Sequence, residues 1–147
     1  MTLEASVPAP PAEPPVTAPR PAVERLITIG GLVVLVLATV FSALLELYWS
    51  PLRIGQVPIG VAILFAAVAN YALCWFAEAA VGRRSAVAVP WVLWTVIMFF
   101  AAGFRTTEGD YLVGPEDWVA LAMILVGSLT FAVYAYRAIL RPTVTKS

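Results

Sequence analysis

Four long apolar runs, none of which contains a charged residue, constrain this chain more than any other feature. Because an α-helix rises about 1.5 Å per residue, a run of about 20 residues is long enough to cross the roughly 30 Å hydrocarbon core of a bilayer. The runs are continuously apolar and lack the alternation of barrel strands, so they predict helices. They cover residues 26–45, 54–77, 85–104 and 118–136.

The composition supports a membrane protein. Of the 147 residues, 61% are hydrophobic and only 12% are charged, and the mean hydropathy is +0.90. An ordinary soluble domain is less apolar and carries about twice that share of charged residues. Short connections make sequential helices antiparallel neighbours, so the predicted fold is all-α, an integral membrane four-helix up-down bundle.

The prolines divide the chain into a tail and a membrane domain. Seven of the twelve prolines lie within residues 1–21, a composition that favours extended segments and cannot bury a core. We predict a disordered Pro-rich cytoplasmic tail at 1–24, a four-helix transmembrane domain at 25–141 and a cytoplasmic tail at 142–147. Docking of the Pro-rich tail into an aromatic groove of another protein stays open as an alternative. The expected spans are approximately 26–48, 55–78, 86–104 and 116–138.

Positive charge is distributed unevenly between the two sides that four spans would create. One side has only Arg53 and Arg105, whereas the side of both termini holds seven of the nine basic residues. Cytoplasmic loops carry the excess of Lys and Arg, so we expect a plasma-membrane protein with both termini in the cytoplasm. The seven residues are Arg20, Arg25, Arg83, Arg84, Arg137, Arg141 and Lys146.

Several function classes are disfavoured at once. The formal net charge is zero, so there is no basic surplus for binding nucleic acid. The chain has no histidine and one cysteine, Cys74, which leaves no imidazole base, no histidine metal ligand and no intrachain disulfide. No acid and base flank a candidate nucleophile. We therefore expect no enzymatic activity, no cofactor and no metal site.

Glu46 is the first candidate functional residue within the membrane. It lies near the outer end of the first span, and Ser42 is one turn earlier on the same helix face. A charge at membrane depth is costly unless it is paired or hydrated, and Arg53 and Arg105 are its natural partners on that side. Glu46 is also close enough to the boundary to reach headgroups, so an interfacial or structural role is favoured.

The second span carries a stripe of small and weakly polar residues. Asn70, near mid-membrane, and Ala66, one turn earlier, lie on this stripe, which we interpret as a helix-packing face. We expect the Asn70 amide to bond to a neighbouring helix, with a place along a solute pathway as the alternative. Glu78, just before Arg83 and Arg84, is expected to form an ion pair at the membrane boundary.

The outer loop 105–117 concentrates four carboxylates in thirteen residues. Its spacing lacks the regular ligand series of a calcium loop, and a turn and a helix start account for most of it. The candidates for docking onto an extracytoplasmic partner are Glu108, Asp110 and Tyr111.

The segment Thr107-Glu108-Gly109-Asp110 precedes a last run that begins at Trp118. Together with the Ala/Val/Pro-rich leader and the four spans, it resembles the small conserved membrane proteins of unknown function found in actinobacteria, over residues 25–140. This resemblance implies a plasma-membrane protein and assigns no catalytic or binding residue.

Two functions are predicted as alternatives. The favoured one is a non-enzymatic accessory or assembly subunit that acts through helix–helix and outer-loop contacts, with the lipid bilayer and a membrane-protein partner or a second copy as partners. The other is a small oligomeric proton-coupled transporter that uses Glu46. Small multidrug transporters have four helices and a glutamate in the first, but the middle of this first span is near Leu37, about 14 Å from Glu46.

Overall fold

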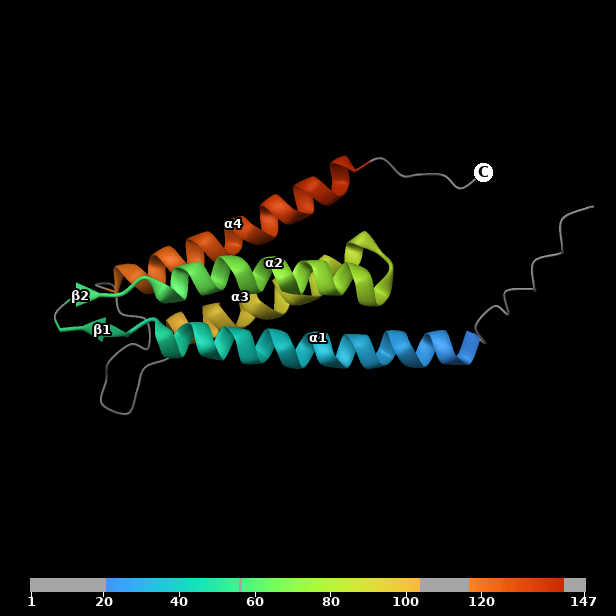
Figure 1. The fold of residues 1–147 in the computed structure, drawn as a ribbon, viewed down its shortest axis with the longest axis horizontal. Helices are drawn as coiled ribbons and strands as arrows, with labels where there is room; N and C mark the ends of the chain where they lie inside the picture. Colours follow the sequence, from blue (N-terminus) through green and yellow to red (C-terminus); the bar gives the residue numbers. More distant parts are fainter. Residues whose placement is uncertain (1–20, 56, 104–116, 142–147) are drawn as a thin grey trace, which may run out of the picture.

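The computed structural model describes residues 21–55, 57–103 and 117–141. In these ranges the chain forms four long helices and one short hairpin (Figure 1). Each long helix, the third counted with its preceding 3-10 turn, is long and apolar enough to cross a membrane, as the sequence predicts. The helices are α1 (Pro21–Trp49), α2 (Val61–Val81), η1 (Arg84–Val87, a 3-10 turn that leads into α3), α3 (Ala88–Gly103) and α4 (Trp118–Leu140).

Helix ends follow local chemistry. Proline is tolerated in a first helical turn, and α1 begins at Pro21, so residues 21–24 of the predicted tail are helical. The side chain of Asp117 caps α4 by accepting a hydrogen bond from Ala120 N at 3.3 Å. Gly82 ends α2 in the left-handed conformation, with φ of 68°. The remaining tail residues, 1–20 and 142–147, lie outside the described ranges.

A hairpin precedes α2, where the sequence predicts the start of the second span. Strands β1 (Arg53–Ile54) and β2 (Val57–Pro58) pair antiparallel, with Ile54 opposite Val57. Gly55 has φ of 64°, which glycine adopts without steric cost in a tight turn. Pro58 lacks an N–H group and suits an edge strand. The second helix therefore begins at Val61 instead of residue 55.

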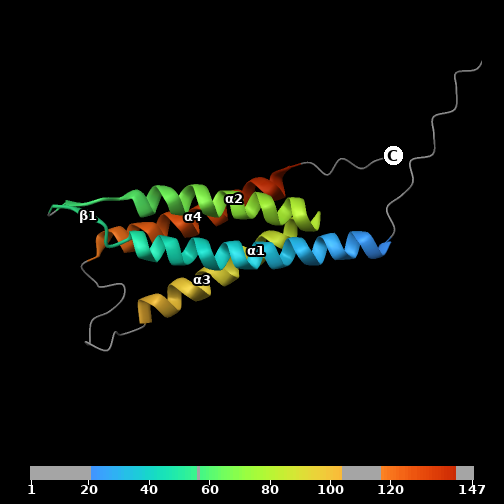
Figure 2. The same ribbon diagram turned by 60° about the horizontal axis from the view of Figure 1, so that its bottom comes forward.

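Helix α2 contacts each of the other three long helices. Figure 1 shows α1 and α3 running in one direction and α2 and α4 in the other. Helix α2 packs along both α1 and α4, whereas the backbone of α3 lies closest to that of α1. In Figure 2, the later turns of α3 diverge from α2 and α4. Sequential helices therefore run antiparallel, and α3 meets α4 mainly through side chains such as Trp94 and Phe131.

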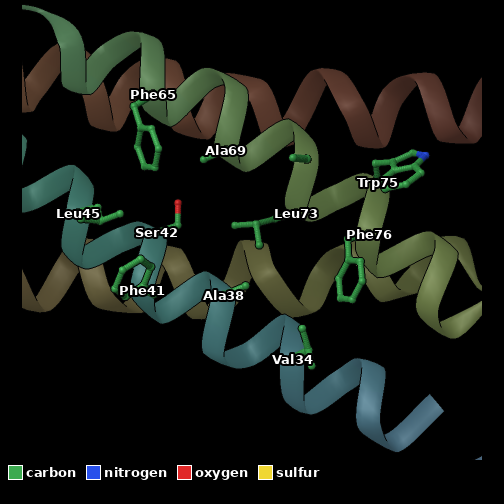
Figure 3. Close-up of a pocket in the computed structure, with 11 residues that line it drawn as sticks. Val34, Ala38, Phe41, Ser42, Leu45, Phe65, Ala69, Leu73, Trp75 and Phe76 are labelled. Atoms are coloured by element: carbon green, nitrogen blue, oxygen red, sulfur yellow. The ribbon is translucent and has the colours of Figure 1, made fainter. Parts of the chain in front are cut away.

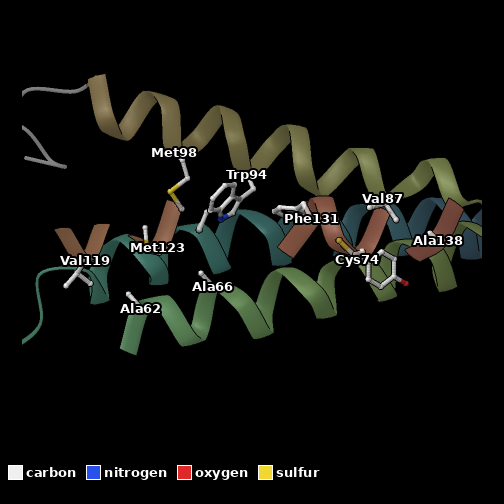
Figure 4. Packing of buried hydrophobic residues seen from close by; sticks show 12 residues of the cluster. Ala62, Ala66, Cys74, Val87, Trp94, Met98, Val119, Met123, Phe131 and Ala138 are labelled. Atoms are coloured by element: carbon white, nitrogen blue, oxygen red, sulfur yellow. The ribbon is translucent and has the colours of Figure 1, made fainter. Parts of the chain in front are cut away.

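Large side chains from α3 and α4 fill the core against small ones from α2. Figure 4 shows Trp94 and Met98 of α3 pointing toward Met123 of α4 and toward Ala62 and Ala66 of α2. All five side chains are buried. Small residues at a helix interface let backbones approach closely, which explains why α2 can contact all three other helices.

Candidate functional site

Glu46 is completely buried and points into the bundle. Its Oε2 accepts a hydrogen bond of 2.8 Å from Trp94 Nε1 of α3, and its Oε1 accepts one of 3.2 Å from Ser42 Oγ. Arg53, one of its two expected partners, is exposed and forms no ion pair with Glu46, and Arg105 lies outside the described residues. The carboxyl group therefore faces neutral donors in the interior of the bundle.

The contacts of α1 with α2 and α4 place Glu46 nearer the middle of the bundle than the middle of its apolar run suggests. Gly31 approaches the last turn of α2 so closely that an added Cβ would lie 2.8 Å from Ala80 Cβ. At the other end, Ser50 Oγ donates a 3.2 Å hydrogen bond to Asp117 Oδ2, at the start of α4. These contacts mark the two ends of the packed part of α1, from Gly31 to Ser50. The middle of this packed part is about 8 Å along the helix from Glu46. The first turns of α1 extend beyond the other helices (Figure 1). The distance of about 14 Å from the middle of the apolar run to Glu46 is therefore longer than the distance from the middle of the packed part.

Asn70 of α2 is also completely buried, but its amide is not hydrogen-bonded. Neither Nδ2 nor Oδ1 has a partner among the residues that the structure describes. The expected bond to a neighbouring helix is therefore not formed there. Gly127 of α4 lies beside this amide. A Cβ added at Gly127 would lie 2.9 Å from Asn70 Nδ2 and 2.6 Å from Trp94 Cζ2. Gly127 thus provides the space that both side chains occupy.

Trp94 connects Glu46 with Gly127, and it was not among the candidate residues predicted from the sequence. Its N–H donates to Glu46, its ring borders Gly127, and the ring centroid lies 5.6 Å from that of Phe131. A buried tryptophan needs a partner for its N–H group. A tryptophan in the middle of the third apolar run therefore indicated a buried N–H group that needs an acceptor, although the sequence did not show which helix supplies it.

Ala66 lies in the same core and is completely buried. It packs against the helices of its own chain, so a bulky replacement there would disturb the bundle before it disturbed a partner.

A second polar cluster joins α2 to α4 toward the C-terminal ends of both helices. Glu78 Oε2 accepts a 2.7 Å hydrogen bond from Tyr134 Oη and forms a 3.4 Å ion pair with Arg141 Nη1. Arg141, and not Arg83 or Arg84, is therefore the partner of Glu78 within the described residues. The Arg141 side chain is 53% exposed, so this pair contributes little to stability.

Two open grooves flank α2 on the outside of the bundle. The α1–α2 groove has a volume of about 460 Å³, and Figure 3 shows Phe41 and Phe65 beside Ala38, Ser42 and Ala69 along it. Ser42 both lines this groove and donates to Glu46, so it links the groove to the buried carboxyl group. The α2–α4 groove has a volume of about 490 Å³.

The outer-loop candidates Glu108, Asp110 and Tyr111 lie outside the described residues. From that loop the structure describes Asp117, whose two carboxylate oxygens bind Ala120 N and Ser50 Oγ. Asp117 therefore ties the start of α4 to the end of α1.

Comparison with protein-family models, with curated proteins and with solved structures gives no match. The resemblance to actinobacterial membrane proteins accordingly stays a prediction.

Proposed function

We propose that the chain is a multi-pass plasma-membrane protein that acts without catalysis, as an accessory or assembly subunit. Its helices cross the bilayer in alternating directions with both termini in the cytoplasm. The charges of the described residues support this orientation, because Arg83, Arg84, Arg137 and Arg141 lie at one end of the bundle and Arg53 at the other.

The orientation is tested with an impermeant maleimide on intact cells. Arg53→Cys is expected to be labelled from outside, and Arg84→Cys only after the cells are opened. Cys74 is buried and serves as the internal background. The reverse pattern would contradict the proposed orientation.

The observation that carries the accessory role is the α1–α2 groove. Over an 18-residue apolar stretch of each helix, 22% of α1 is buried within the chain, against 33% of each of the other three helices. Helix α1 is therefore the least covered. Its exposed face borders a groove in which small residues from both helices lie side by side, and such residues are typical of interfaces between membrane helices. We propose that an apolar transmembrane helix of a partner subunit packs there. The small residues are Ala38, Ser42, Ala69 and Ala72.

A matched pair of substitutions on α2 tests this proposal. Ala69 lines the α1–α2 groove and Ala67 lines the α2–α4 groove, and both are partly buried. The tagged protein is purified from its native membrane in mild detergent, and the mass and composition of the particle are determined. We expect a stoichiometric second subunit with wild type and with Ala67→Leu, and its loss with Ala69→Leu. A wild-type particle without a second subunit, or unchanged composition in Ala69→Leu, would contradict the proposal.

The second candidate is a small oligomeric proton-coupled transporter, favoured by the contact between Ser42 and Glu46. A solute in the groove would meet the Ser42 hydroxyl, whose hydrogen bond leads to a buried carboxyl group. In proteoliposomes with an imposed proton gradient, uptake of tetraphenylphosphonium would then be lost in Glu46→Gln and kept in Glu78→Gln. Equal uptake in wild type and Glu46→Gln would rule out this carboxylate mechanism.

A further inference from the structure

The α2–α4 groove combines an apolar interior with a cation at one end. Val68 of α2 and Leu129 and Val133 of α4 line it, and Arg137 completes its lining toward the end of α4. The Thr130 hydroxyl within the groove donates 2.8 Å to Val126 O of its own helix. This hydroxyl is therefore already engaged, and Arg137 is the feature that a charged ligand would meet.

The length of the groove matches one leaflet of a bilayer. Along α4 it extends from Val126 to Arg137, which corresponds to about 16 Å of helix. Half of the hydrocarbon core is about 15 Å thick. Arg137 also lies about 28 Å along the helix from Trp118, where α4 begins, and thus close to the opposite boundary. The groove therefore reaches from mid-membrane to the inner boundary.

The positive charge of Arg137 is not neutralised by a carboxylate in the described part of the chain. Arg137 is exposed and forms no ion pair there, and Glu78 is already bound by Arg141 and Tyr134. Arg83 and Arg84 follow the inner end of α2, which adds further positive charge. The α1–α2 groove differs, because no charged residue lines it.

We propose that the α2–α4 groove binds an anionic phospholipid of the cytoplasmic leaflet. One acyl chain lies along the groove and the lipid phosphate contacts the Arg137 guanidinium group. Basic residues at the cytoplasmic ends of membrane helices bind such headgroups through charge and hydrogen bonds. The inference rests on the proposed membrane placement and orientation, but not on the accessory role.

Native mass spectrometry in mild detergent tests the site with phosphatidylglycerol and phosphatidylcholine of identical acyl chains. We expect wild type to prefer phosphatidylglycerol, and Arg137→Gln to lower that affinity about fivefold, which corresponds to about 1 kcal/mol for one arginine near the membrane surface. Phosphatidylcholine also carries a phosphate, but its choline group offsets the charge, so its binding should fall by less in this variant. Arg137→Lys should keep the preference. Ala67→Leu, which fills the groove, should weaken both lipids, whereas Ala69→Leu should leave both unchanged.

Three results would overturn the proposal. The first is equal phosphatidylglycerol affinity in wild type and Arg137→Gln. The second is binding of glycerol 3-phosphate as tight as that of the lipid, which would indicate a site for free phosphate. The third is loss of lipid in Ala69→Leu but not in Ala67→Leu, which would place the lipid in the other groove. Since binding is measured in detergent, the site is tested independently of the orientation, and a reversed maleimide pattern would overturn the leaflet assignment alone.

Discussion

Glu46 of α1 and Asn70 of α2 are both completely buried polar side chains, yet their hydrogen bonding is opposite. Both oxygens of Glu46 accept a hydrogen bond, whereas neither amide atom of Asn70 has a partner among the described residues. The difference arises from the facing helices. Helix α3 offers Glu46 the N–H group of Trp94, while α4 presents Gly127, which has no side chain, to Asn70.

This difference has an energetic consequence. A buried polar group costs free energy unless it is hydrogen-bonded, so a satisfied and an unsatisfied group respond differently when they or their neighbours are replaced. Substitutions around Glu46 should destabilise the bundle, and removal of the Asn70 amide should stabilise it.

The largest expected effect is that of Trp94→Phe. The substitution removes the stronger of the two donors to Glu46 and part of a buried ring, so the free energy of unfolding should fall by about 3 kcal/mol. Unfolding by dodecyl sulfate in dodecyl maltoside micelles, followed by circular dichroism, measures the change. The matched control is Trp91→Phe, because Trp91 is 42% exposed on the same helix and should change stability little. Equal losses in the two variants would show that the Glu46 bond contributes nothing.

Gly127→Ala should have the next largest effect, a loss of about 2 kcal/mol. The added methyl group would lie 2.6 Å from Trp94 Cζ2, so the indole must shift away from Gly127 and its bond to Glu46 is disturbed. Gly30→Ala is the control, because nothing lies within 4 Å of its added Cβ and alanine favours the helix by up to about 1 kcal/mol. Should Gly127→Ala be as stable as Gly30→Ala under the same dodecyl sulfate titration, the proposed space-sharing role of Gly127 would be wrong.

The sequence predicted the helices well because charge and proline mark their ends. Asp117 lies in the predicted helix-start segment and caps α4, and the uncharged runs locate all four helices. The hairpin at 53–58 was missed because its residues are uncharged beyond Arg53 and look like the start of a span. Gly55 and Pro58 were the signals against a helix at that place.

In the candidate site, the contact within one helix could be predicted from the sequence, but the contacts between helices could not. Ser42 and Glu46 are four residues apart, which places them on one face of α1, and they are hydrogen-bonded as this spacing allows. The bond from Trp94 was not predictable, because α3 is apolar all round and its hydropathy does not show which face points inward. Likewise, the sequence did not show that the Asn70 amide faces Gly127 of α4. Gly127 has no side chain and cannot supply the expected interhelical bond through one.

The smallest effects, about 1 kcal/mol each, test the comparison most directly because they should have opposite signs. Ser42→Ala removes a donor to the buried Glu46 and should destabilise the protein. Asn70→Leu replaces an amide without a partner in the described structure by apolar groups of nearly the same size and should stabilise it, since the desolvation cost of the amide disappears without leaving a cavity. Both variants are measured in one dodecyl sulfate titration series against wild type. A loss of stability in Asn70→Leu would show that the Asn70 amide is hydrogen-bonded in the membrane and that the two buried positions are alike.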